Sequence, residues 1–91
     1  MLVTFQWDPK KRRENLTKHK VDFADATAVL EDPRALTRDD PHPNEDRFVT
    51  LGMDGLGRIL VVSWTSRDEE FRLISARKAT RDERAQYEDI R

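Results

Sequence analysis

The chain has 91 residues, enough for one modest hydrophobic core and too few for two, so we expect a single domain over residues 1–91. It contains no cysteine, which excludes a disulfide framework, a thiolate nucleophile and a sulfur-ligated metal site and favours a reducing compartment. The formal net charge of −1 argues against a strong overall attraction to nucleic acid, and the longest apolar run, residues 59–62, is far shorter than the ~20 residues that cross a bilayer, so we expect a cytoplasmic protein without membrane contact.

The first expected elements are a short strand over residues 2–7 and a helix from Pro9 to about His19. Asp8 is placed to cap this helix, and Pro9 suits its first position because a missing N–H costs nothing there. Leu16 is the only clearly apolar residue of the helix, and Arg12 and His19 fall on the same stripe. Either the alkyl stems of basic residues cover apolar surface, or the polar side chains face a ligand. The sequence favours neither.

A second helix is expected to begin after Asp22, which reads as its N-cap. Its apolar residues Phe23, Ala26, Val29 and Leu30 fall on one face, so this helix should pack on a sheet. The helix should end at residues 32–33, because the residue before a proline is pushed out of the helical region.

Strands dominate the rest of the chain. We expect a weak strand at residues 35–38, a loop at 39–44, and strong strands at 47–53, 58–66 and 71–78, the first two of these joined by a Gly-containing turn at 54–57. Thr80 and Glu83 form a capping box that announces a last helix, on which Glu83, Tyr87 and Ile90 share a stripe. The predicted fold is α+β with the order β-α-α-β-β-β-β-α: a largely antiparallel meander with two helices on one face and a third at the end.

The charges are unevenly distributed along the chain. Residues 1–20 carry six Lys/Arg and two acids, whereas residues 21–46 carry two Lys/Arg and eight acids. This split suggests a basic surface suited to phosphate and an acidic surface suited to a basic partner. A solvated surface of mixed charge explains the same counts more simply, so the split alone decides nothing.

Motifs for nucleotide or metal binding are missing from the sequence, and neither a metal ion nor another cofactor is expected. The serines lack a plausible His and acid partner set for a hydrolase triad. What remains is a set of cations with one histidine, a tyrosine and acids. That inventory fits metal-independent RNA cleavage, in which a base deprotonates the 2′-OH, cations stabilise the phosphorane and an acid protonates the 5′-oxygen.

Five ordered blocks along the chain resemble the BrnT family of ribonuclease toxins. They are residues 5–10 (FQWDPK), 15–19 (NLTKH) with 21–23 (VDF), 45–47 (EDR), 74–79 (ISARKA), and Glu83-Arg84 with Tyr87. The resemblance implies a RelE-like fold and the toxin half of a type II toxin–antitoxin pair, an endoribonuclease that inhibits translation and growth. Lys20 stands where the family usually has glycine, which would suit a left-handed helix cap, so a lysine there should cost roughly 1 kcal/mol.

Lys18, His19, Arg47, Arg67 and Arg77 are our candidate catalytic residues, and Lys11, Arg72 and Lys78 are candidate RNA contacts. His19 lies at a helix C-terminus, where the dipole favours the imidazolium of a general acid, although it could simply cap carbonyls. By period two, Arg77 should share a face with Ser75, Leu73 and Phe71 and bind phosphate; a salt bridge to Glu83 or Asp82 is the alternative.

Glu45 and three aromatic residues are further residues whose roles can be predicted. Glu45 could orient one of the arginines or act as the base. Trp7 and Trp64 could stack on RNA bases, but both fall in expected strands, so we expect them in the core. The ring of Tyr87 is also expected in the core, with its hydroxyl exposed to water.

The resemblance also implies partners. These are an RNA substrate and a BrnA-like ribbon-helix-helix antitoxin, which should form a hetero-oligomer of two copies each and bind operator DNA through the antitoxin. The acidic segment from Asp22 to Asp46 offers a surface for the antitoxin. The alternative reading is a non-catalytic cytosolic binding module whose acidic loop, residues 39–46, pairs with a basic protein.

Overall fold

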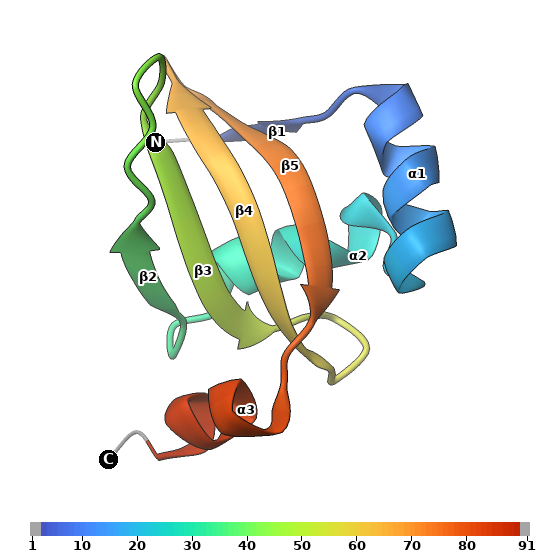
Figure 1. Cartoon of the computed structure of the whole chain (residues 1–91), viewed down its shortest axis with the longest axis vertical. Helices are drawn as coiled ribbons and strands as arrows, with labels where there is room; N and C mark the ends of the chain where they lie inside the picture. Colours follow the sequence, from blue (N-terminus) through green and yellow to red (C-terminus); the bar gives the residue numbers. More distant parts are fainter. Residues whose placement is uncertain (1–2, 90–91) are drawn as a thin grey trace.

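The computed structural model describes residues 3–89, which form five strands, three α-helices and one 3₁₀ segment (Figure 1). The elements are β1 (Thr4–Gln6), α1 (Pro9–His19), α2 (Phe23–Ala26), η1 (Thr27–Glu31), β2 (Leu36–Asp39), β3 (Arg47–Met53), β4 (Ile59–Arg67), β5 (Glu70–Lys78) and α3 (Arg81–Glu88). The α+β class and the predicted order of elements are confirmed. Residue 2 of the expected first strand and Ile90 of the expected last helix lie outside the described residues.

All five strands form one sheet in the order β1-β5-β4-β3-β2. Strands β2 to β5 make the expected antiparallel meander, and β1 adds to β5 in parallel. Strand β1 pairs with β5 through residues 4–6 and 70–72, so within the described part of the chain the second half of β5 has no strand on its outer side. That unpaired stretch is where α1 packs.

The predicted caps are present at all three helices. The carboxylate of Asp8 accepts from the N–H of Lys10, that of Asp22 accepts from Ala24, and Thr80 and Glu83 form a reciprocal capping box. The expected second helix differs in its second half, which tightens into the 3₁₀ segment η1 after Ala26. Phe23, Ala26 and Val29 are nevertheless fully buried, as their common face predicted.

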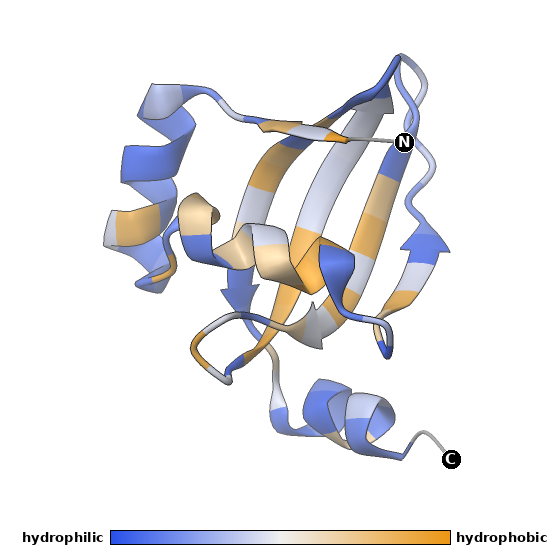
Figure 2. Ribbon diagram, turned by 180° about the vertical axis from the view of Figure 1, so that it is seen from behind, coloured by the Kyte–Doolittle hydropathy of each residue, from blue (hydrophilic) through white to orange (hydrophobic). Residues whose placement is uncertain are grey.

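The two faces of the sheet are covered unequally. One face is covered by α2 and η1, which lie across the strands in Figure 2, and holds the main core around Phe23, Leu60, Val62 and Leu73. Figure 1 looks onto the opposite face, where no helix of residues 3–89 crosses the middle of the strands; α3 lies below its end. There Tyr87 of α3 packs with Leu51 and Val61 in a second, smaller cluster. We call this whole side of the sheet, on which Leu51 and Val61 lie, the open face.

A β-bulge in β5 corrects one expectation. Ser63 pairs with Ser75 but the next residue, Trp64, pairs with Leu73, so Ile74 is an extra residue in β5. An extra residue reverses the alternation of side chains along the strand. Leu73 and Ala76 are therefore both in the main core, whereas Arg77 shares the open face with Ser75 and not with Leu73 or Phe71.

Helix α1 is attached to β5 through a polar residue. Neither of the two interpretations of its polar sequence predicted this. Leu16 is 45% exposed, whereas Asn15 is buried. The side-chain amide of Asn15 donates to the carbonyl oxygens of Ala76 (2.8 Å) and Val21 (2.9 Å), and its oxygen accepts from the N–H of Ala76 at 3.0 Å. Asn15 thus takes the place of a neighbouring strand at the unpaired edge of β5. Arg12 adds a bidentate contact to Asp22 and lies over the Trp7 ring.

Lys20 ends α1 in the left-handed conformation, with φ of 61° and ψ of 31°. The strained lysine expected from the resemblance is therefore present. Replacing Lys20 by Gly should stabilise the protein by about 1 kcal/mol, because glycine adopts this conformation without the clash of a Cβ atom. Thermal unfolding of both proteins measures the gain. Lys20→Ala is the control, which keeps the Cβ atom and should gain little; an equal gain in both variants would contradict the backbone explanation.

Candidate functional site

Side chains on the open face form rows that cross the sheet, because residues directly opposite each other on neighbouring strands share a face. One row is Leu36, Leu51, Val61 and Arg77; the next is Arg38, Val49, Ser63 and Ser75; a third is Arg47, Thr65, Arg72 and Gln6. The first of these rows, beside α3, is apolar apart from Arg77, the second is mostly polar, and the third carries two arginines. A surface of this kind can hold a polyanion over its length.

Four predicted site residues share this face, although they are far apart in the sequence. Arg47 and Arg72 lie in one row on either side of Thr65, Arg67 lies further along β4, and Arg77 lies at the other end of β5. The backbones of β3 and β5 are separated by about 10 Å, two strand spacings, so long arginine side chains can reach neighbouring phosphates. The sheet thus brings together cations that the sequence places thirty residues apart.

Arg77 forms a salt bridge with Glu83, which was the alternative to phosphate binding. Its guanidinium makes a bidentate contact to Glu83, with nitrogen–oxygen distances of 2.8 and 2.9 Å. The hydrogen bonds from Arg77, followed by the N–H of Thr80, hold the pKa of Glu83 at about 2. The Arg77 side chain is still 40% exposed, so the pair lies at the surface, where an anionic ligand can reach the guanidinium.

The free energy of unfolding at acid pH should depend on the ion pair between Arg77 and Glu83. A carboxyl group whose pKa is lower in the folded state stabilises the fold above its ordinary pKa of 4.5, and this contribution disappears as the pH falls to about 2. Exposure of both partners limits the contribution to about 1 kcal/mol or less. We expect the difference in unfolding free energy between the wild type and Glu83→Gln to shrink between pH 4.5 and 2; denaturant titrations at several pH values measure it. A constant difference would contradict this role.

Arg47 is held by a neighbouring acid. Its Nε donates to Glu45 at 2.8 Å, so Glu45 orients an arginine, one of its two expected roles. The hydroxyl of Thr65 donates to the carbonyl oxygen of Asp46 at 2.6 Å and fixes the acidic loop, residues 39–46, to β4. Asp39, Asp40 and Asp46 of this loop lie beside His42 in a shallow surface depression. By contrast, Asp22 and Asp32 of the acidic segment are engaged within the fold.

A second group of predicted residues meets beside the bulge. Lys11, Lys18 and His19 of α1 line a depression together with Ile74 and Ser75 of β5. Ser75 also belongs to the open face, and Arg77 follows it on that face at a distance of about 7 Å along the strand. The basic side chains of α1 and the arginine of β5 therefore flank one stretch of strand.

Lys78, predicted as an RNA contact, lies apart from both groups. It lines a different depression with Arg58, Ile59 and Arg84, at the end of the sheet near α3. Arg38 was missed by sequence reasoning, yet it lies on the open face in the same row as Ser63 and Ser75. Only the pairing of β2 with β3 reveals this, because β2 is short and exposed along its length.

The aromatic candidates are structural. Trp64 is in the main core, and Trp7, which follows β1 rather than lying in it, contacts Phe23. The ring of Tyr87 is buried as expected, but its hydroxyl donates to Asp32 at 2.6 Å instead of to water. Burial opposes the ionisation of Asp32, but hydrogen bonds from Tyr87 and from backbone N–H groups outweigh it and lower the pKa.

Residues 3–89 lack two kinds of feature. No group of three or more His, Asp or Glu side chains in this part of the chain is placed to hold a metal ion. Nor is any helix within the described range long and apolar enough to span a membrane.

A solved structure of another protein is similar to this fold. The chain matches over 88% of its length, and over 100% of the other chain, the crystal structure of the Brucella abortus ribonuclease toxin BrnT, with 25% identity and a TM-score of 0.66. No curated protein sequence matches the chain. Residues 7–83 match the sequence profile of a family described as the ribonuclease toxin, BrnT, of type II toxin–antitoxin systems. The chain therefore belongs to the BrnT family of ribonuclease toxins, whose substrate is RNA and whose partner is an antitoxin.

Proposed function

We propose that the protein is an endoribonuclease that cleaves RNA without a metal ion, by attack of a 2′-OH on the adjacent phosphate. The observation that supports this most directly is the gathering of Arg47, Arg67, Arg72 and Arg77 on one uncovered sheet face. Guanidinium groups bind phosphate in a bidentate manner and stabilise the charge that develops on a phosphorane. The same face reaches the depression that holds Lys18 and His19.

The roles of these groups follow from their chemistry. The 2′-oxygen loses its proton to a base and attacks phosphorus, the bond from phosphorus to the 5′-oxygen breaks, and the departing 5′-oxygen takes a proton. His19 is our candidate acid, because an imidazolium can donate the proton that the 5′-oxygen takes and this residue ends α1 beside Ser75 of β5. Arg77 and Lys18 flank the strand next to it and stabilise the phosphorane. Arg47, Arg67, Arg72 and Lys11 hold the RNA on either side, and Lys78 contacts it at the sheet end.

Cleavage in the presence of EDTA tests this function. Pure protein and a radiolabelled RNA should yield fragments that end in a 2′,3′-cyclic phosphate, and a substrate with a single 2′-deoxynucleotide should resist cleavage at that position only. RNA that stays intact over a range of protein concentrations and pH would contradict the proposal. Cleavage that requires added Mg²⁺ would contradict the metal independence.

We also propose that the antitoxin is a BrnA-like ribbon-helix-helix protein that joins the toxin in an assembly of two copies each, binds operator DNA and holds the enzyme inactive in the cytoplasm. Ribbon-helix-helix domains dimerise to bind DNA, which sets the stoichiometry. The acidic loop, residues 39–46, is the surface that we assign to this partner. Coexpression with the product of the neighbouring gene should give a hetero-oligomer by light scattering, and failure of that product to bind would contradict the assignment.

A further inference from the structure

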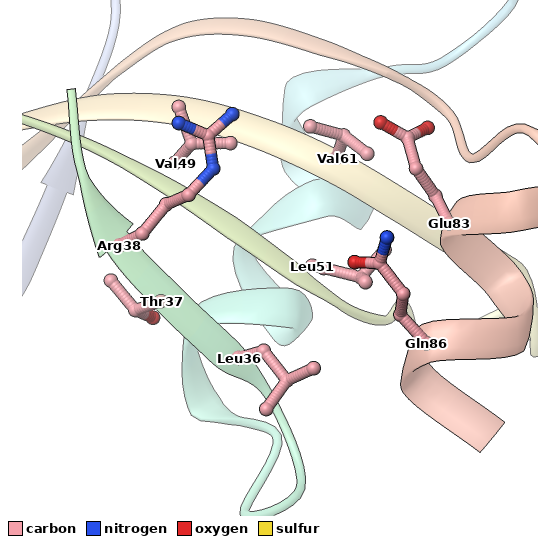
Figure 3. A pocket seen from close by; sticks show the side chains of 8 residues that line it. All are labelled: Leu36, Thr37, Arg38, Val49, Leu51, Val61, Glu83 and Gln86. Carbon is pink, nitrogen blue, oxygen red and sulfur yellow. The ribbon is translucent and has the colours of Figure 1, made fainter. Parts of the chain in front are cut away.

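We propose that a groove between β2, β3, β4 and α3 is a subsite for one purine base of the RNA substrate. This inference rests on the proposed cleavage of RNA at the open face and adds a base preference to it. Figure 3 shows the groove: Arg38 rises from β2 on one side, Glu83 and Gln86 extend from α3 on the other, and the aliphatic side chains of Val49, Leu51 and Val61 lie between them.

The floor of the groove suits a flat apolar body. Val49, Leu51 and Val61 face it from neighbouring strands, and Leu36, which is 42% exposed, closes the side next to the sheet edge. The volume is about 260 Å³, a little below the range of pockets that hold whole drug-sized ligands. One base with part of its ribose matches that size better than a helix of another protein does, because a helix needs an open channel.

The rim of the groove supplies hydrogen bonds of a particular kind. The amide of Gln86 and the guanidinium of Arg38 are the side-chain groups that pair with the N7 edges of adenine and guanine, respectively. Only purines carry N7, and a pyrimidine would leave both groups without that partner. The groove therefore distinguishes purines from pyrimidines while accepting either purine.

The position of the groove relative to Arg77 connects it to the reaction. Val61 is directly opposite Arg77 in the register of β4 and β5, and Glu83, on the groove's rim, is the residue that holds the Arg77 guanidinium. A phosphate that takes the place of Glu83 on Arg77 has the groove immediately beside it. Arg77 and Arg38 are cations at the two ends of the groove, and the floor between them is apolar. This arrangement matches a nucleotide, whose base is flat and apolar and whose phosphates are anionic.

Methyl signals in NMR spectra test directly whether a base occupies the groove. The probes are three uncleavable 2′-O-methyl tetranucleotides, one with adenine, one with uracil and one abasic, added to the isolated full chain. We expect the methyl groups of Val49, Leu51 and Val61 to respond to the adenine strand at about fivefold lower concentration than to the uracil strand, and not to the abasic strand. Equal responses to all three strands would overturn the subsite.

Substitution of Gln86 tests the base preference in the reaction. Cleavage rates are compared for two oligonucleotides that differ only in a purine or pyrimidine at the preferred position. Gln86→Leu should reduce the wild-type preference by about fivefold or more. Glu88→Leu, on the same helix but outside the groove, is the matched control and should keep the preference. A wild type without any purine preference, or a preference that survives in Gln86→Leu, would overturn the inference.

Two outcomes separate this inference from the proposed function. If the protein cleaves RNA in EDTA while the three groove residues stay silent towards every strand, the subsite is wrong and the enzyme stands. If the groove residues respond only to the antitoxin, the groove is a protein-docking site and the inference fails in the same way. Absence of both cleavage and tetranucleotide binding contradicts the proposed function and the subsite together.

Discussion

RNA cleavage should fall about 100-fold or more when Arg77 is replaced by Gln, because one cation that faces the developing phosphorane charge is worth about 2.7 kcal/mol or more at the transition state. Stability should change little. The ion pair that the substitution breaks lies at the surface, with side-chain exposures of 40% for Arg77 and 27% for Glu83, and such pairs contribute about 1 kcal/mol or less. Single-turnover cleavage and thermal melting of the same preparations measure both effects.

Two further variants separate the chemical role of Arg77 from its salt bridge. Glu83→Gln removes the same ion pair but leaves the guanidinium in place, so it should share the small loss of stability and keep far more of the activity. Val62→Ala, in the main core, should lower the melting temperature through a cavity while the folded fraction cleaves normally. If Arg77→Gln melts much lower than Glu83→Gln and cleaves normally while folded, Arg77 is a structural residue and the site lies elsewhere.

Local signals made most of the fold predictable from the sequence. Asp8, Asp22 and Thr80 cap the helices that they were expected to cap, since a cap depends on residues within one turn. The meander β2 to β5 was predictable because each strand is joined to the next by a short connection. The place of β1 beside β5 was not, since that pairing joins residues almost seventy positions apart.

The features that the sequence could not predict depend on the β-bulge and on the register of the strands. Period-two reasoning placed Arg77 with Leu73 because nothing local marks Ile74 as an extra residue. For the same reason, the spatial grouping of the candidate site residues could not be predicted from the sequence. Residue chemistry identified the arginines and His19, but only the register shows that four of the arginines share a face, that Arg38 joins them, and that Lys78 lies apart.

The largest loss of stability that we expect from one polar substitution is at Asn15. Asn15→Ala removes three hydrogen bonds and leaves the N–H and carbonyl of Ala76, together with the carbonyl of Val21, without their partner. Each unpaired buried group costs about 1–3 kcal/mol, so at the low end of that range the three groups together cost about 3 kcal/mol. In a domain of this size that corresponds to a fall in melting temperature of about 12–24 °C.

The adjacent residue provides the control. Leu16, the one clearly apolar residue of α1, would be the anchor of this helix if hydrophobic burial held it, but it is 45% exposed. Leu16→Ala should therefore change the stability by only about 0.5 kcal/mol. Asn15→Asp makes the comparison sharper, because a carboxylate can still accept from the N–H of Ala76 but repels the two carbonyl oxygens to which the amide donates; it should melt at least as low as Asn15→Ala. A larger loss in Leu16→Ala than in either Asn15 variant would mean that α1 packs through its apolar residue and that the polar clamp on β5 is not what holds the helix in place.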